Sequence, residues 1–266
     1  MTKAVEAPAS RTAQAVRLSG VSKAFGSGAS ALLALDDVSL DVRPGEFVCL
    51  LGASGCGKST LLNLVANLDK PSAGTIDLGD ARVALMFQEP ALFPWLTVSG
   101  NLELALRQRG VPRGERKRRA SELLASVHLS GFERKRPHQL SGGMRQRVAL
   151  ARALALTESQ GDERPTVLLM DEPFGALDAM TRDLLHDELE RIWRERRLSV
   201  LFVTHNVREA VRLGDRVVLL SSRPGRVIQD FPVELPRPRR IDSPDVASLA
   251  ATITDRLKEE VSRHGF

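Results

Sequence analysis

The chain has 266 residues, 42% of them hydrophobic and 27% charged, which is the composition of a globular protein that can build a sizeable core. No apolar run approaches the length of a membrane span, and two cysteines are too few for a disulfide framework. The net charge of +5 comes with basic runs at 113–119 and 134–136, which leaves nucleic acid and an anionic membrane surface open as partners.

The N-terminal part predicts a disordered tail and then two strands. Residues 1–15 are rich in Ala, Pro and polar residues without a hydrophobic segment, so we expect no signal peptide. Residues 16–24 and 34–42 alternate like antiparallel strands around a Gly/Ser turn. Phe25, just before this turn, either stacks on an adenine ring or is an aromatic residue of the core or of a sheet edge, and its spacing alone favours the second.

Residues 52–60 match the phosphate-binding loop G-x-x-x-x-G-K-[ST]. An apolar run at 47–51 predicts a buried strand before the loop, and leucines at helical spacing follow it. Loop N–H groups and the helix N-terminus would face phosphates, with Lys58 on the β- and γ-phosphates and the Ser59 hydroxyl on Mg²⁺. The predicted nucleotide-binding residues are Gly52, Ala53, Ser54, Gly55, Cys56, Gly57, Lys58, Ser59 and Thr60.

The two cysteines have different expected roles. Cys49 lies within the apolar strand and is expected in the core. Cys56 lies beside Lys58 at a helix N-terminus, an environment that lowers a thiol pKa. We therefore expect alkylation to inhibit the protein and ATP to protect it, the alternative being a small residue that the loop merely tolerates.

The middle of the chain predicts a strand, an exposed loop and a helical region. Residues 79–87 read as a strand ending at Gln88. The loop from Gln88 to Val98 holds two prolines and the apolar Leu92, Phe93, Trp95 and Leu96. These side chains either form a protein-docking patch or fold back onto the core. The pattern from 101 to about 129 is helical and strongly charged.

A second helix begins after Ser141, which can cap it, and Gly142 and Gly143 leave its N-terminus open to an anion. An ordinary Ser-capped helix is the alternative for this segment taken alone. Residues 181–197 then predict an amphipathic helix of the core.

Two carboxylates and a histidine follow predicted strands in the second half of the chain. The apolar run 167–170 leads into Asp171 and Glu172, which suit Mg²⁺ binding and activation of a water molecule, respectively. A turn that only caps the next element is the alternative. The strand at 198–203 ends at His205, which would share the same sheet edge. Strands at 217–220 and 226–228 precede a Pro- and Arg-rich, weakly helical tail.

Taken in order, these motifs resemble the ATP-binding subunit of ATP-binding cassette (ABC) transporters over residues 16–230. The resemblance implies an adenine-stacking role for Phe25, a γ-phosphate and Mg²⁺ sensor in Gln88, and a catalytic base in Glu172. It implies a switch histidine in His205 and a D-loop at 175–178 that ends in Asp178. It makes 140–146 the family signature, of which Ser141, Gly142 and Gly143 would bind the ATP of a second subunit. Met144 stands where the family usually has Gln.

The resemblance also implies an α/β fold: a P-loop NTPase core with a mixed sheet, an N-terminal antiparallel β subdomain and an inserted α-helical subdomain at about 89–160. Residues 231–266 would form a C-terminal extension. The implied ligands are ATP and Mg²⁺, and the implied partners are a second copy, a transmembrane permease contacted through the loop from Gln88 to Val98, and indirectly a solute-binding protein.

Local likenesses at 87–95, 171–182, 220–226 and 235–240 resemble the nitrate/sulfonate/taurine group of bacterial importers. They imply an ATPase on the cytoplasmic face of the membrane that drives uptake of a small anionic solute, with no nucleic acid as partner. The alternatives are a cassette ATPase acting on nucleic acid or ribosomes, the ATPase half of an exporter, and a nucleotide-binding regulator without turnover.

Overall fold

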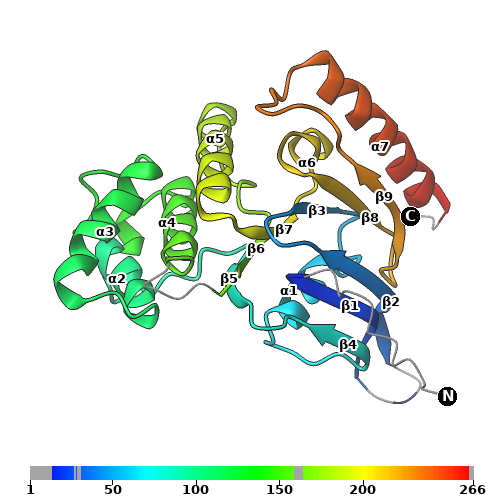
Figure 1. Cartoon of the computed structure of the whole chain (residues 1–266), viewed down its shortest axis with the longest axis horizontal. Helices are drawn as coiled ribbons and strands as arrows, with labels where there is room; N and C mark the ends of the chain where they lie inside the picture. The colour runs from blue at the N-terminus through cyan, green and yellow to red at the C-terminus, as the bar shows by residue number, and fades with distance from the viewer. Residues whose placement is uncertain (1–13, 27, 29–30, 159–163, 264–266) are drawn as a thin grey trace, which may run out of the picture.

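The computed structural model describes residues 14–26, 28, 31–158 and 164–263, and it is built around a six-stranded central sheet (Figure 1). Residues 1–13 of the expected disordered tail lie outside this part. Neighbouring strands are parallel except for the last pair, β8 and β9. In spatial order the strands are β5 (Arg82–Met86), β6 (Thr166–Asp171), β7 (Ser199–Val203), β3 (Phe47–Leu51), β8 (Arg216–Leu220) and β9 (Val227–Pro232).

The three central strands β6, β7 and β3 are buried at every residue, as their continuous apolar runs predict. Successive side chains of β3 serve opposite faces of the sheet. Phe47, Cys49 and Leu51 join the core formed with the helices α2 to α7, whereas Val48 and Leu50 join the core shared with α1 (Lys58–Val65) and the N-terminal strands.

A second, antiparallel sheet has the order β2 (Leu32–Val42), β1 (Val16–Phe25) and β4 (Ala73–Asp77). Strand β4 was not predicted, because its mostly exposed residues lack the apolar alternation by which a strand is recognised. Gly74 allows its close approach to β1, since a Cβ there would lie 2.2 Å from the Gly20 carbonyl oxygen. The predicted strand at 79–87 is shorter than expected, because residues 79 and 80 form a turn.

The helices α2 (Val98–Gln108), α3 (Arg113–Ser126) and α4 (Gly142–Ala155) gather at one end of the molecule (Figure 1). A short 3₁₀ turn, η2 (Pro137–Gln139), precedes α4. The single helical region expected from 101 to 129 is two helices. Gly110, with φ of +76°, and Pro112 separate them, because neither residue continues a helix well. The mixed sheet, the antiparallel sheet and these helices confirm the predicted fold class.

The remaining helices are α5 (Ala179–Arg196), α6 (Val207–Leu213) and α7 (Pro244–Arg263). The tail expected to be weakly helical therefore contains a helix of 20 residues. Its buried residues Val246, Ala250 and Ile253 recur at helical spacing, and α7 packs against α6. None of the described helices combines the length and apolar character needed to cross a membrane.

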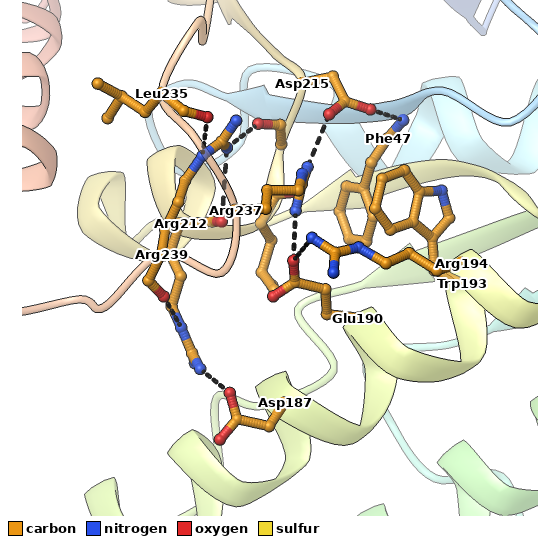
Figure 2. Close-up of polar contacts among 12 residues, drawn as sticks. Phe47, Asp187, Glu190, Trp193, Arg194, Arg212, Asp215, Leu235, Arg237 and Arg239 are labelled. Carbon is orange, nitrogen blue, oxygen red and sulfur yellow. Dashed lines mark hydrogen bonds and ion pairs between the residues drawn. The ribbon is translucent and has the colours of Figure 1, made fainter.

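Two arginines fasten the segment between β9 and α7 to the core, the partly buried Arg237 and the buried Arg239 (Figure 2). The guanidinium of Arg237 lies 4.5 Å from the Trp193 ring centroid and pairs with Glu190 at 3.2 Å and Asp215 at 2.7 Å. Arg239 donates to the carbonyl oxygens of five residues: Val211, Arg212, Gly214, Val233 and Leu235. Burial, together with the neighbouring Arg237 charge, lowers the pKa of Arg239 to about 10.

Candidate active site at the phosphate loop

Three parallel strands, β3, β6 and β7, bring the predicted site residues to one edge of the central sheet. The phosphate loop follows β3, Asp171 ends β6 with Glu172 directly after it, and Thr204 and His205 follow β7. Because parallel strands end at the same edge, residues more than a hundred positions apart in sequence become neighbours there.

The backbone of the phosphate loop has the shape that a bound anion needs. Gly55 and Gly57 have φ of +76° and +104°, and a Cβ on Gly57 would lie 2.7 Å from Leu35 Cδ2. Helix α1 begins after Gly57 with no side-chain cap and no acidic residue in its first turn. Its N-terminus therefore offers positive potential and backbone donors to a phosphate group, and the residues present fit a nucleotide.

The buried ammonium group of Lys58 is turned onto the loop itself. Its Nζ donates to the carbonyl oxygens of Gly52 at 2.8 Å and Ala53 at 2.9 Å. These hydrogen bonds give the ammonium group acceptors within the loop and hold the Lys58 side chain there.

The expectation of a low thiol pKa at Cys56 is wrong. The side chain is 1% exposed, and burial raises its pKa, although the Lys58 charge 3.8 Å from the sulfur acts in the opposite direction. Removal from water disfavours the thiolate more than the neighbouring cation favours it. Cys49 is fully buried as expected, and burial raises its pKa as well.

Ser59 and Asp171 form the junction between α1 and β6. The Ser59 hydroxyl lies close to the Asp171 carboxylate, which is largely buried. Burial raises the pKa of Asp171 and the Glu172 charge adds to this, while the neighbouring Ser59 hydroxyl and the Lys58 charge oppose it. A hydroxyl and a carboxylate side by side form a donor set that fits Mg²⁺.

Glu172 and His205 contact each other at this edge. The Nδ1 atom of His205 lies 3.0 Å from Oε2 of Glu172, and the His205 side chain is 68% exposed. The backbone of Glu172 has φ of +45° and its N–H donates to the Val203 carbonyl at 3.0 Å. The residue therefore leaves β6 in an uncommon conformation that is held by the end of β7.

A buried polar chain supports the loop that carries His205. The Thr204 hydroxyl bonds to the Glu209 carboxylate, whose other oxygen lies 2.7 Å from Nε2 of His186. The Asn206 N–H donates to Thr204 Oγ1 at 3.0 Å. The ring of His186, which is fully buried, also meets the edge of Phe174. Sequence analysis missed this chain, because His186 and Glu209 lie on helices whose packing it does not specify.

An open pocket of about 280 Å³ lies over the phosphate loop. The predicted residues that line it are Phe25, Ser54, Gly55, Gly57, Lys58, Ser59, Thr60, Gln88 and Glu172. Leu32, Ala34 and Arg223 also line it and were not predicted as site residues, because the likeness at 220–226 that contains Arg223 assigns it no role and no motif marks the other two. Phe25 is 43% exposed, with Lys23 Nζ 5.0 Å from its ring centroid, so a position in the core is excluded for this residue.

The second predicted phosphate-type helix start does not line this pocket. The Ser141 hydroxyl caps α4 by accepting from the Met144 N–H at 3.2 Å, and Ser141 and Gly142 are exposed. Gly143 faces Leu177, since a Cβ there would lie 3.2 Å from Leu177 Cδ2. Asp178 is likewise outside the pocket and caps α5, accepting from the Thr181 N–H at 2.9 Å.

The loop after Gln88 divides its apolar side chains between core and surface. Leu92 packs against the core, whereas Trp95 is 68% exposed and contacts Phe93 with ring centroids 5.5 Å apart. The fully buried Asn101 anchors the loop, with its amide bonded to the Phe93 N–H and to the Phe93 and Thr97 carbonyls. The loop therefore folds back onto the core through Leu92 and leaves Trp95 at the surface.

Known proteins match this chain over most of its length. The family model of the ABC transporter matches residues 35–175. An aliphatic sulfonates import ATP-binding protein of Rhodopseudomonas palustris is 46% identical over 247 residues, covering 91% of this chain and 83% of that protein. A nitrate import ATP-binding protein of Synechocystis is 43% identical over 228 residues, covering 83% of each. A dimeric ATP-binding cassette solved in a post-hydrolysis state with ADP and Pi is similar with a TM-score of 0.72 and 35% identity, over 83% of this chain and 99% of that one.

Proposed function

This chain belongs to the ABC transporter family, as an ATP-hydrolysing subunit, and we propose that it powers uptake of a small anionic solute through a separate transmembrane permease. The observation that carries the proposal is the meeting of Glu172 and His205 at 3.0 Å beside the phosphate-loop pocket. A nucleotide-binding protein without turnover needs no such pair at this place.

We assign ATP binding to the pocket residues. The phosphate loop holds the phosphates, with Lys58 moving from the Gly52 and Ala53 carbonyls to the phosphate oxygens. Phe25 supplies a half-exposed aromatic face for the adenine ring, and Leu32 extends this apolar wall.

Ser59 and Asp171 hold Mg²⁺ in this proposal, together with Gln88, which lines the same pocket as Ser59. When bound, the metal ion neutralises charge that develops on the phosphate oxygens. The rise in the pKa of Asp171 through burial is then opposed by a cation, which favours the ionised carboxylate.

Hydrolysis is assigned to Glu172 and His205. Glu172 orients the attacking water and accepts its proton. A carboxylate only accepts hydrogen bonds, so the contact with His205 requires a proton on Nδ1, and it holds the Glu172 side chain in place. Lys58 and the loop N–H groups stabilise the charge on the phosphate oxygens.

A second copy completes the site in this proposal. Ser141, Gly142 and Gly143 form an exposed helix start outside the pocket of their own subunit, so they are available to the phosphates of another. The dimeric arrangement of the similar cassette supports this assignment.

The loop from Gln88 to Val98 is assigned to permease docking. It begins at the pocket with Gln88, whose carbonyl accepts from Gln146 at 3.4 Å, and it displays Trp95 at the surface. A change at the nucleotide can therefore reach the docking surface within a few residues. The chain would accordingly lie on the cytoplasmic face of the membrane as a peripheral subunit.

The solute class follows the relatives that import aliphatic sulfonates and nitrate. The test measures uptake of nitrate, methanesulfonate and taurine by cells in which the gene is deleted and then restored as wild type or as Glu172→Gln. We expect the deletion to abolish uptake of one of these anions, wild type to restore it, and the variant to fail. Uptake of all three unaffected by the deletion would refute the solute class.

A further inference from the structure

The turn between β8 and β9 carries an arginine into the nucleotide pocket. Arg223 lines the pocket together with Lys58 and Phe25, and its Nε donates to the Gly55 carbonyl oxygen at 3.1 Å. Its side chain is exposed, and no carboxylate pairs with it anywhere in the described part of the chain. The cation is therefore free to accept an anionic partner.

The turn is held rigidly against the phosphate loop. Gly225 donates to the Ala34 carbonyl at 2.9 Å and accepts from the Asp36 N–H at 3.0 Å. A Cβ on Gly225 would lie 2.2 Å from the Cys56 carbonyl oxygen, so only glycine allows this approach. The turn thus contacts both β2 and the phosphate loop.

Hydrogen bonds within the turn fix its shape. The Ser221 hydroxyl donates to the Pro224 carbonyl at 2.7 Å and accepts from the Arg226 N–H at 2.8 Å. Arg226 pairs with Asp36 and does not line the pocket. The two arginines of this turn therefore have different contacts: Arg226 forms an ion pair with Asp36, whereas Arg223 contacts the phosphate loop.

We propose that Arg223 is a second cationic contact for the phosphates of the bound nucleotide, alongside Lys58. The planar guanidinium keeps its Nη groups available while Nε bonds to Gly55, and its fork matches phosphate oxygens. Gly55 permits this close approach because it has no side chain, since a Cβ there would crowd Arg223 Nη2 at 3.2 Å. This inference rests on the proposed nucleotide site and adds to it a residue from the opposite end of the chain.

The experiment measures binding of ATP, GTP and tripolyphosphate to the purified full-length chain by calorimetry. Arg223→Gln should weaken all three about tenfold, the size of one exposed charge-assisted contact. Arg223→Lys should lose less, because it keeps the charge without the fork. The matched control is Arg226→Gln, which loosens the same turn but leaves Arg223 in place and should bind normally.

Three results would overturn the inference. If Arg223→Gln bound ATP within twofold of the wild-type affinity, a contact between Arg223 and the phosphates would be excluded. Loss for ATP without loss for tripolyphosphate would assign Arg223 to the base or ribose. Equal losses of affinity in Arg223→Gln and Arg226→Gln would show that Arg223 only supports the conformation of the loop. Failure of the wild-type chain to bind ATP at all would instead refute the proposed function.

Discussion

Nδ1 of His205 lies 3.0 Å from Oε2 of Glu172, although the two residues follow different strands of the sheet. The contact exists because β6 and β7 are parallel neighbours, with Asp171 paired to Val203. The positive φ of Glu172 turns its side chain out of the strand at this point.

Replacing Glu172 by Gln should lower kcat for ATP hydrolysis by about 10²–10⁴-fold, because the amide cannot take a proton from water. ATP binding should persist, since the amide keeps the size of the side chain. Phosphate release measures the first effect and calorimetry the second. The control Glu122→Gln removes an exposed carboxylate on α3 and should hydrolyse ATP like wild type. Turnover retained by Glu172→Gln would exclude Glu172 as the base.

A mixture of two inactive variants should regain ATPase activity if the site is shared between copies. Lys58→Ala disables the phosphate loop, and Ser141→Arg blocks the signature helix start. In a mixed dimer, one site combines both lesions and the other combines an intact loop with an intact signature. The ATPase rate of the mixture should exceed that of either variant alone. No gain, with mixed dimers verified by differently tagged chains, would contradict binding in trans.

Trp95→Ala should leave the basal ATPase activity and the unfolding midpoint of the purified chain unchanged, because this side chain is 68% exposed and contacts mainly Phe93. Association with the permease should be lost, as measured by recovery of the chain with membranes and by anion uptake. Leu68→Ala, which removes another exposed apolar side chain, is the matched control. Unfolding of Trp95→Ala would instead assign Trp95 to the core.

The two thiols should react slowly with Ellman's reagent in the native protein, because burial raises the pKa of both. A raised pKa reduces the thiolate at neutral pH, so the rate should increase as pH rises above the ordinary thiol range. Unfolding in guanidinium should make both thiols accessible to the reagent at once. The variant Cys56→Ser, in which only Cys49 can react, shows which of the two thiols reacts faster in the native protein. Rapid modification of Cys56 at pH 7 in the folded chain would contradict the burial argument.

Arg237→Ala should destabilise the protein by about 2–4 kcal/mol, because it leaves the buried Glu190 with Arg194 as its remaining cation and removes the partner of Asp215 and of the Trp193 face. Urea unfolding measures the change. Arg240→Ala in the same segment is the control, since its pair with Asp242 is exposed and its loss should not shift the midpoint. Equal midpoints for wild type and Arg237→Ala would show that the cluster in Figure 2 does not fasten the C-terminal segment.

The sequence by itself determined the central part of the fold and the chemistry of the site. The apolar runs at 47–51 and 167–170 predict buried strands because strands covered on both faces cannot alternate. The phosphate loop is recognisable because few residue types permit its backbone. The carboxylates 171 and 172 are recognisable because they directly follow the apolar run 167–170, at the end of strand β6. These features depend on local constraints of the backbone and of burial, so a contiguous stretch of residues specifies each of them.

Only the tertiary structure decided which distant residues act together. Strand β4 has no pattern of its own and forms because β1 offers it an edge. Arg223 enters the pocket because β8 lies beside β3, and the thiol pKa of Cys56 rises because neighbouring elements exclude water from it. The apolar residues of the loop from Gln88 to Val98 look alike in sequence, yet Leu92 packs against the core and Trp95 is exposed, in a loop that Asn101 anchors at Phe93. Burial and proximity depend on the whole packed chain, and no contiguous stretch of sequence specifies them.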